Sequence, residues 1–522
     1  MAASWLKDAV FYEIYPQSFY DTNGDGIGDL KGITAKLPYV KRLGCNALWL
    51  NPFYDSPFRD AGYDVRDHKK IASRYGTEDD LKELLDTAHS LGIRVLFDLV
   101  PGHTSTEHPW FKGSCEEAPN DLWHRYIWTD CAFTRGDTMP FIGGEAKRNG
   151  TFIVNYFAFQ PALNYGYTQI NEPAWQMPID ASAALQTREA MKDIMRHWLS
   201  FGCDGFRVDM ADSLVKNDAP EKKGTMEVWK DITAAIHAEF PDAALVSEWN
   251  DPRQALGCGF DMDFYLDWGG NGYNSLLRDF QRNTFGELTT KDNSYFKADS
   301  TRDMSRFLED YLPPYEATKD MGLWCLITGN HDTNRPAPFL TDMERRLAYA
   351  FLFTMPGAPF LYYGDEIGMR YRWLPTKEGG YQRTGSRTPM QWDHSENMGF
   401  STAPSDDLYL PIDDAPGAPT VADQEADPHS LLHHMRKVIA LRHREPQLQN
   451  YSPFTVYSAE KGSRLFAYKR GQLLLAVNPG TESLQLALDG SYEVLFTIGD
   501  PTVAGHTATL PAQSFLILKP CE

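Results

Sequence analysis

Short runs of branched and aromatic residues alternate along most of the chain with longer stretches in which apolar residues recur at helical spacing. The short runs predict buried strands, and the longer stretches predict amphipathic helices. The predicted strands lie at residues 10–15, 47–50, 94–100, 205–209, 244–248, 262–266, 323–329 and 360–363. Helices are expected between them, for example at residues 30–43, 78–91, 187–201, 223–240 and 342–353. Eight strands that alternate with helices predict an α/β protein built on a (β/α)8 TIM barrel.

The alternation of strands and helices is interrupted at two places. Between the third and fourth predicted strands lies a segment too long for a simple loop, so we expect an inserted subdomain at residues 104–176. Beyond residue 454, short alternating runs separated by Gly, Asn and Pro predict antiparallel strands. The barrel would therefore comprise residues 1–103 and 177–445, followed by a C-terminal antiparallel β-sandwich at residues 446–522.

Composition narrows the class of partner. The 522 residues carry a formal net charge of −21, which would repel nucleic acids and anionic membranes. Aromatic residues make up 13% of the chain, and their flat apolar rings suit a neutral sugar, although an aromatic-rich core gives the same composition. We expect a small-molecule substrate, no nucleic-acid or membrane partner, and a monomer or small homo-oligomer.

The N-terminus and the cysteines bear on location. The chain starts without a basic region followed by an apolar stretch, so no secretory signal is predicted. The longest apolar stretch, residues 347–363, is too short for a bilayer and contains two prolines. The seven cysteines are scattered and show no metal-binding spacing. A cytoplasmic location is expected, and no organic cofactor is predicted.

Polar side chains follow four of the predicted strands at the point where each strand ends. They include the acids Asp209, Glu248 and Asp332 and the histidines His103 and His331. The carboxyl ends of barrel strands meet at the mouth where this fold places its chemistry. A lone acid there could be structural, but three acids with two histidines favour a reaction site.

These clusters resemble the conserved regions of the α-amylase superfamily, glycoside hydrolase family 13, and they follow in that family's order. The matching segments are DLVPGH at 98–103, GFRVD at 205–209, VSEW at 246–249 and TGNHD at 328–332, with further matches at 160–164 and 357–366. The resemblance extends from about residue 8 to residue 400. It implies a retaining glycoside hydrolase or transglycosylase.

The resemblance also implies a division of roles among the acids. Asp209 would be the nucleophile, Glu248 the general acid/base, and Asp332 would bind sugar hydroxyls and help to distort the ring. A retaining mechanism needs one ionised carboxylate to attack the anomeric carbon and a second carboxyl group to protonate the leaving oxygen and later activate water.

Arg207 and the histidines are expected to support these acids. Because strand residues alternate with period two, Arg207 should lie on the same face as Asp209 and keep that carboxylate ionised. Glu248 is expected to lie away from this charge and so to keep its proton at higher pH. By resemblance, His103 and His331 would donate hydrogen bonds to the bound sugar.

The segment DAGYD at residues 60–64 narrows the substrate. It resembles family members that remove one glucose from a non-reducing end, in which the tyrosine stacks on the glucose and the aspartate binds its far hydroxyls. Here these residues are Tyr63 and Asp60. The same members carry two arginines before a PMQW run, which correspond to Arg383 and Arg387. A pair between Asp60 and Arg383 would block the pocket beyond one glucose, which predicts exo-action.

The loop at residues 21–29 has the oxygen donors of a hard-cation site. Carboxylates, an amide and a main-chain carbonyl recur at alternate positions around glycines, and the predicted ligands are Asp21, Asn23, Asp25, Ile27 and Asp29. The loop begins like an EF-hand, but Gly32 stands where the bidentate Glu would be. A structural calcium site resembling that of oligo-1,6-glucosidases is expected, with magnesium as an alternative and a metal-free glycine-rich turn as the other interpretation.

Several residues depart from the family pattern. Gly102 stands where the family usually has Asn before the histidine. Met210 follows the nucleophile, where Val or Ala tends to separate α-1,6 from α-1,4 preference, and Trp249 and Asn250 are not typical of oligo-1,6-glucosidases. The leaving-group side therefore stays unassigned.

Three functions fit this sequence. The leading hypothesis is an exo-acting α-glucosidase on short α-glucosides. The runner-up is a glucosyl-transferring or isomerising enzyme of the trehalose synthase or sucrose isomerase type, in which a sugar instead of water accepts the covalent intermediate. A non-enzymatic scaffold would have lost acids and gained a membrane anchor, and neither feature is found.

Overall fold

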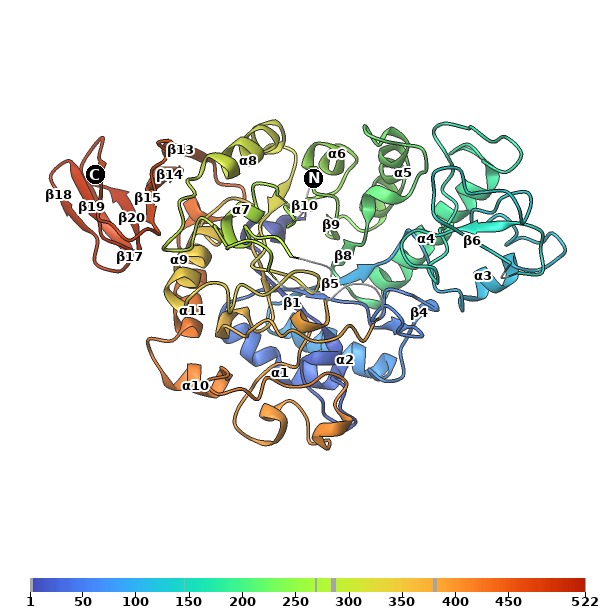
Figure 1. Cartoon of the computed structure of the whole chain (residues 1–522), viewed down its shortest axis with the longest axis horizontal. Coiled ribbons are helices and arrows are strands. Elements are labelled where there is room, and N and C mark those ends of the chain that lie inside the picture. The colour runs from blue at the N-terminus through green and yellow to red at the C-terminus, as the bar shows by residue number, and fades with distance from the viewer. Residues whose placement is uncertain (1–2, 145, 268–269, 283–287, 379–382, 522) are drawn as a thin grey trace.

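The computed structural model describes residues 3–144, 146–267, 270–282, 288–378 and 383–521. Within this part of the chain, the centre of the molecule is a sheet of eight parallel strands surrounded by helices (Figure 1). Its strands are β1 (Phe11–Ile14), β2 (Ala47–Leu50), β5 (Arg94–Leu99), β8 (Gly205–Val208), β9 (Ala244–Ser247), β10 (Met262–Phe264), β11 (Leu323–Cys325) and β12 (Phe360–Tyr362).

The strand order is β11-β10-β9-β8-β5-β2-β1-β12, and a parallel bridge between Ile327 and Phe360 joins the two ends of the sheet. The predicted (β/α)8 barrel is therefore confirmed, with each predicted strand in place. The predictions run past several observed C-terminal ends, because the residues that follow each strand leave the ladder to form the mouth of the barrel. Trp49 and Phe264 pack together inside it, with ring centroids 5.4 Å apart.

The helices around the barrel follow the apolar periodicity. They include α1 (Leu30–Leu43), α2 (Glu78–Ser90), α4 (Ser182–Phe201), α5 (Lys223–Glu239), α8 (Ser305–Thr318), α9 (Asp342–Leu352) and α11 (Leu431–Arg444). Asp29 caps the start of α1, and Gly44 ends it with a φ of 104°, a conformation that glycine adopts without strain. The helix α8 contains Pro313 and Pro314 within its span, so tertiary packing maintains it against the low helical propensity of proline.

Two excursions from the barrel surround its mouth. The hairpin β3 (Tyr54–Asp55) and β4 (Asp67–Ile71) follows β2 and carries the segment with Asp60 and Tyr63. Between β5 and β8 lies the inserted segment, with α3 (Pro109–Ser114), β6 (Phe141–Gly143) and β7 (Thr151–Ile153). This segment has its own small core, formed by Ile127, Ile153, Ala162, Tyr167 and Trp175.

The C-terminal region consists of two antiparallel sheets. One has the order β13 (Phe454–Ser458), β14 (Phe466–Arg470), β15 (Leu473–Asn478), β20 (Ser514–Pro520) and β17 (Tyr492–Ile498); the other has β16 (Leu484–Ala487), β19 (Thr507–Leu510) and β18 (Thr502–Ala504). Leucines and alanines from both sheets share one buried cluster. The predicted C-terminal antiparallel domain is confirmed, and it lies at the opposite end of the molecule from the inserted segment (Figure 1).

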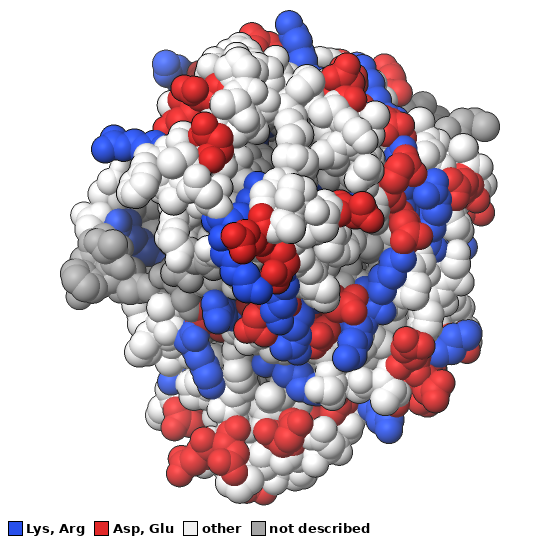
Figure 2. All heavy atoms as spheres, turned by 90° about the vertical axis from the view of Figure 1, so that its right-hand side faces the viewer, with Lys and Arg blue, Asp and Glu red and all other residues white. Residues whose placement is uncertain are grey.

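The surface has mixed charge despite the net negative balance. On the face that carries the inserted segment, basic and acidic side chains alternate over an otherwise uncharged surface (Figure 2). Among the described residues, no helix is both long and apolar enough to cross a lipid bilayer.

Candidate active site

A cavity of about 340 Å³ opens at the carboxyl ends of the barrel strands. Asp209 directly follows β8, and Glu248 directly follows β9. Because Val208 pairs with Ser247 in the parallel ladder, these two acids stand level with each other. The residues that line the cavity are Asp60, Tyr63, His103, Tyr156, Asp209, Met210, Asp212, Glu248, Asp332 and Arg383.

The fully buried guanidinium of Arg207 lies beneath the floor of this cavity and contacts three carboxylates. Its Nη1 is 3.0 Å from Asp209 Oδ1 and 2.9 Å from Asp98 Oδ1, as expected from strand alternation. Its Nη2 is 2.8 Å from Glu248 Oε2. The prediction that Glu248 lies away from this charge is therefore wrong, because the neighbouring strand brings Glu248 onto the same guanidinium.

The two acids nevertheless differ in protonation. Burial raises the pKa of Asp209 to about 7, against the opposing effect of Arg207. The prediction that Arg207 keeps Asp209 ionised is therefore wrong, because burial outweighs the guanidinium. Burial also raises the pKa of Glu248 to about 8; Arg207 opposes this shift and the charge of Asp209 adds to it. Burial and neighbouring carboxylates raise both pKa values, and a glutamic acid starts from the higher ordinary value, so Glu248 keeps its proton to somewhat higher pH than Asp209.

Asp332 is held as a carboxylate by two arginines. Its Oδ1 accepts from Arg383 Nη1 at 2.9 Å and from Arg387 Nη2 at 2.8 Å. Burial favours the protonated form, but Arg383 and Arg387 outweigh it and hold the pKa of Asp332 well below its usual range. Arg387 lies behind Asp332 and does not line the cavity; its other nitrogen is 2.6 Å from Glu378.

Arg383 also reaches across to Asp60, with Nη2 2.5 Å from Asp60 Oδ1. The second oxygen of Asp60 accepts from Gln160 Nε2 at 2.8 Å. Burial raises the pKa of Asp60 to about 6, opposed by the nearby arginines. The predicted pair between Asp60 and Arg383 is therefore present, and it closes one end of the cavity.

The two predicted sugar-binding histidines occupy different positions. His103 lines the cavity, whereas His331 is buried behind Tyr63 and does not. The Nδ1 of His331 is 2.8 Å from Glu13, and its Nε2 is 2.8 Å from the Tyr63 hydroxyl. The rings of Tyr63 and His331 stack 5.3 Å apart, so His331 supports the tyrosine from behind.

Several lining or supporting residues were not assigned from the sequence. Asp98 and Gln160 lie in recognised motifs, so their contacts with Arg207 and Asp60 could have been sought there. Met210 is buried partly, has a φ of 42°, and donates its backbone N–H to Glu248 Oε2 at 2.9 Å. Tyr156 and Asp212 also line the cavity. Nothing in the sequence pointed to them except that they lie near motif residues.

The loop predicted to bind calcium lies between the barrel's first strand and α1. Both carboxylate oxygens of Asp21 accept hydrogen bonds, from the backbone of Asn23, Gly24 and Gly26 and from Ser401 Oγ at 2.6 Å. Among the residues that the structure describes, no group of three or more His, Cys, Asp or Glu side chains is arranged to hold a metal ion. The oxygen donors suit a hard cation, and calcium stays a prediction.

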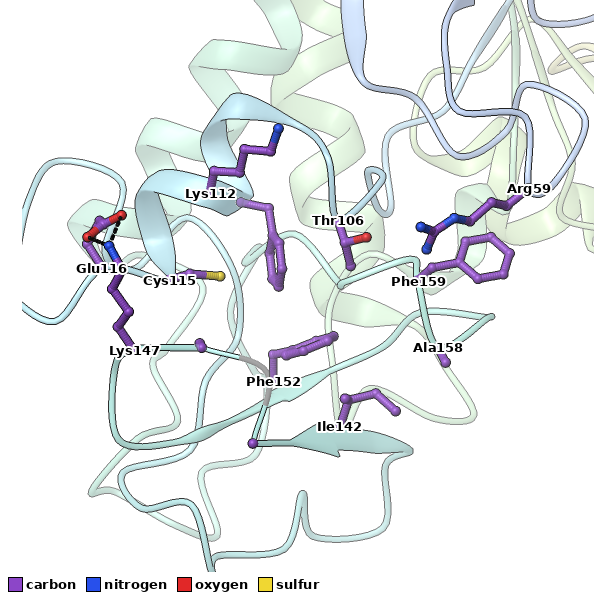
Figure 3. A pocket seen from close by; sticks show the side chains of 13 residues that line it. Arg59, Thr106, Lys112, Cys115, Glu116, Ile142, Lys147, Phe152, Ala158 and Phe159 are labelled. Atoms are coloured by element: carbon purple, nitrogen blue, oxygen red, sulfur yellow. Dashed lines mark hydrogen bonds and ion pairs between the residues drawn. The ribbon is translucent and has the colours of Figure 1, made fainter.

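The inserted segment contains a larger cavity of about 980 Å³, away from the acids (Figure 3). Phe111, Phe152 and Phe159 contribute to its lining. Its described carboxylate, Glu116, is paired with Lys147 at 2.9 Å. Without two carboxyl groups in differing protonation states, this cavity lacks what glycosidic cleavage requires, so the smaller cavity is the candidate active site.

A barrel whose mouth holds two neighbouring buried carboxyl groups has the groups that cleavage of a glycosidic bond requires, and comparison with known proteins identifies the chain as an enzyme that acts on such bonds. The chain belongs to the alpha-amylase family, since the model of the alpha amylase catalytic domain matches residues 13–451. A second model, a domain of unknown function termed DUF3459, matches residues 461–517. The predicted family is thereby confirmed.

Relatives within the family have more than one activity. The chain is 34% identical to the trehalose synthase/amylase TreS of Mycolicibacterium smegmatis, over 84% of this chain and 76% of the relative. It is 32% identical to the oligo-1,6-glucosidase of Heyndrickxia coagulans, over 84% of this chain and 85% of that protein. The trehalulose synthase MutB from Pseudomonas mesoacidophila MX-45 superposes with a TM-score of 0.82 at 25% identity, covering 99% of this chain and 100% of the other.

Proposed function

We propose that the chain is a retaining enzyme that removes one glucosyl unit from the non-reducing end of short α-glucosides. The observation that carries this proposal is the closed end of the active-site cavity. There Arg383 joins Asp60 to Asp332, and Arg387 buttresses Asp332 from behind. Charged side chains occupy the space that a further sugar would need.

Asp60 and Arg383 form the most enclosed part of the cavity lining, with side chains 4% and 13% exposed. The side chains of Asp212 and Asp332 are more accessible, at 29% and 31%. In this proposal the terminal glucose lies against Asp60 and Arg383. Its leaving group would extend past Met210 and Asp212 toward solvent.

In this proposal the acids act in sequence. Asp209 attacks the anomeric carbon, and Glu248 donates its proton to the departing oxygen. Glu248 then removes a proton from the acceptor, whose oxygen displaces Asp209 and restores the original anomeric configuration. Tyr63, His103 and Arg207 would hold the sugar and the nucleophile in place.

The acceptor can be water or a second sugar. Hydrolysis gives an α-glucosidase, which fits the similarity to oligo-1,6-glucosidase. Transfer to a sugar gives a glucosyl-transferring or isomerising enzyme. Two similarities favour this second candidate. One is to TreS. The other is to an isomaltulose synthase variant from Erwinia rhapontici NX5 solved with sucrose, which superposes with a TM-score of 0.80 at 25% identity and 99% coverage of both chains.

A substrate panel tests both candidates. Purified enzyme is incubated with maltose, isomaltose, sucrose and trehalose, and the products are scored as free glucose or as new disaccharides. Hydrolysis predicts glucose in its α-form as the first product, visible by proton NMR before mutarotation. Cleavage in the middle of long maltooligosaccharides, with disaccharides left intact, would contradict the one-glucose pocket.

The loop at residues 21–29 is proposed to hold a structural calcium or magnesium ion. Asp21, Asn23, Asp25 and Asp29 would supply side-chain oxygens and Ile27 its carbonyl oxygen. An ion there would stabilise the start of α1, which Asp29 already caps. It would take no part in the reaction.

A further inference from the structure

Asn155 connects the inserted segment to the mouth of the barrel. It lies just after β7, and its side-chain Nδ2 is 3.3 Å from His103 Nδ1 and 3.3 Å from Ser213 Oγ. Its Oδ1 accepts a hydrogen bond from Lys216 Nζ at 2.8 Å. Gly102, His103, Ser213 and Lys216 follow barrel strands, so one amide spans the boundary between the two parts of the chain.

The orientation of this amide follows from Lys216. An ammonium group has donors and no acceptor, so the atom that faces Lys216 must be the carbonyl oxygen of Asn155. Lys216 is itself fixed, because it is 5% exposed and also donates to the carbonyl of Ser213 at 2.5 Å. The NH2 group of Asn155 must then face His103.

His103 requires such a donor. Its Nε2 lies 3.2 Å from the carbonyl oxygen of Tyr63, which can only accept, so Nε2 carries the hydrogen. Burial lowers the pKa of His103 to about 3, so the ring is neutral and its Nδ1 is an acceptor. Asn155 supplies the matching N–H.

Gly102 makes room for this contact. A Cβ atom added at Gly102 would lie 2.7 Å from Asn155 Nδ2 and 3.3 Å from Ser213 Oγ. Its backbone does not have the positive φ that favours glycine, so space is what requires glycine there. The amide of Asn155 thus occupies the volume that a side chain at position 102 would need.

We propose that Asn155 is a positioning residue for His103, and that Gly102 is small because Asn155 supplies an amide from the inserted segment. This inference rests on the proposed function, since His103 lines the cavity that would hold the sugar. Both ring nitrogens of His103 are engaged by Tyr63 and Asn155, so the predicted hydrogen bond from His103 to the sugar is not available in this arrangement, and His103 would act as a fixed wall of the pocket. The same turn also carries Gln160, which bonds Asp60, and the Asn155 backbone N–H donates to the Gln160 carbonyl at 3.0 Å. The turn therefore contacts two residues that line the cavity, Asp60 and His103.

A double-mutant cycle separates positioning from general packing. The kcat/KM for p-nitrophenyl α-glucoside is measured for Asn155→Leu, His103→Ala and the double variant. Loss of one positioning hydrogen bond should lower kcat/KM about ten-fold, chiefly through KM. In the His103→Ala background, Asn155→Leu should cost almost nothing further. An equal loss in both backgrounds would overturn the proposal.

The matched control is Asn171→Ala. Asn171 lies in the same segment and bonds Asp137 at 3.1 Å on the surface, so its replacement should leave kcat and KM unchanged. If Asn171→Ala and Asn155→Leu lowered activity equally, the effect would belong to the segment as a whole and the proposal would be wrong. Absence of wild-type activity on every α-glucoside would instead contradict the proposed function, because the cycle compares variants with an active wild type.

Two further variants give readouts that a purely structural role would not change. Asn155→Asp keeps the contact with Lys216 but places a carboxylate against His103 Nδ1, which raises the pKa of the imidazole. The imidazole of the variant should therefore become protonated at higher pH than in the wild type, and the acidic limb of its kcat/KM profile should shift to higher pH. Gly102→Asn alone should clash, and combined with Asn155→Gly it should regain activity relative to Gly102→Asn. An unchanged pH profile together with no regain would overturn the proposal.

Discussion

The guanidinium of Arg207 contacts both Asp209 and Glu248, with one nitrogen 3.0 Å from the first carboxylate and the other 2.8 Å from the second. One fixed positive charge thus favours the ionised form of both acids. It does not distinguish them: burial raises the pKa of both acids, and the charges of neighbouring carboxylates add to each shift. The reacting pair should titrate as two neighbouring steps.

The first prediction concerns pH. Asp209 must be ionised to attack and Glu248 protonated to donate, so kcat/KM should rise as pH passes the pKa of Asp209, about 7, and fall as it passes that of Glu248, about 8. The measurement is kcat/KM on maltose from about pH 5 to pH 10. A maximum near pH 5 would contradict these protonation states.

The second prediction separates the roles of the acids. Asp209→Asn should lower kcat/KM by about 10⁴-fold or more on any substrate, because no covalent intermediate forms. Glu248→Gln should lower it by about 10³-fold on maltose. With 2,4-dinitrophenyl α-glucoside, whose leaving group needs no proton, the rate of glucosyl-enzyme formation in Glu248→Gln should fall much less. If Glu248→Gln lost the same factor in rate on both substrates, Glu248 would not be the general acid.

The third prediction concerns the closed end of the cavity. Arg383→Ala leaves Asp60 and Asp332 without a shared partner, and kcat/KM on maltose should fall about 10²-fold. The kcat/KM on maltoheptaose should fall less, because the space vacated by the Arg383 side chain can accept a further sugar. Arg370→Ala is the matched control, since Arg370 pairs with Asp413 at 2.7 Å outside the cavity. An unchanged ratio between the two substrates would count against exo-action.

Much of the fold could be predicted from the sequence because each barrel strand is buried and each covering helix has one apolar face. The ends of strands could not, since apolar residues such as Val100 and Leu266 continue the pattern beyond the last paired residues of β5 and β10.

The acids of the site could be predicted because each follows directly after a predicted strand. The contacts between side chains of neighbouring strands could not be predicted. Alternation along one strand predicts that Arg207 and Asp209 share a face. The contact of Arg207 with Glu248 depends on the register of β8 against β9, which a single sequence does not contain. Asn155 and Tyr156 come from a turn of the inserted segment, and tertiary structure alone brings that turn to the barrel.

The last prediction concerns the proposed metal ion. If calcium binds the loop at residues 21–29, EDTA should lower the Tm of the wild type by roughly 2–3 °C, because an ion at 100 times its Kd stabilises by about 2.7 kcal/mol and a chain of 522 residues has a large unfolding entropy. Added calcium should restore the Tm, and a parallel addition of magnesium identifies the preferred ion. Asp21→Ala also removes hydrogen bonds within the loop, so its lower Tm is not informative. The informative result is that its Tm no longer responds to EDTA.

The control for this experiment is Asp427→Ala, which removes an exposed carboxylate that accepts one backbone N–H outside the loop. Its Tm should respond to EDTA as the wild type does. A wild-type Tm that EDTA and added calcium both leave unchanged would show that the hydrogen bonds of Asp21 and Asp29 maintain the loop alone. Activity should follow the Tm at high temperature only, because the loop lies outside the cavity that holds the reacting acids.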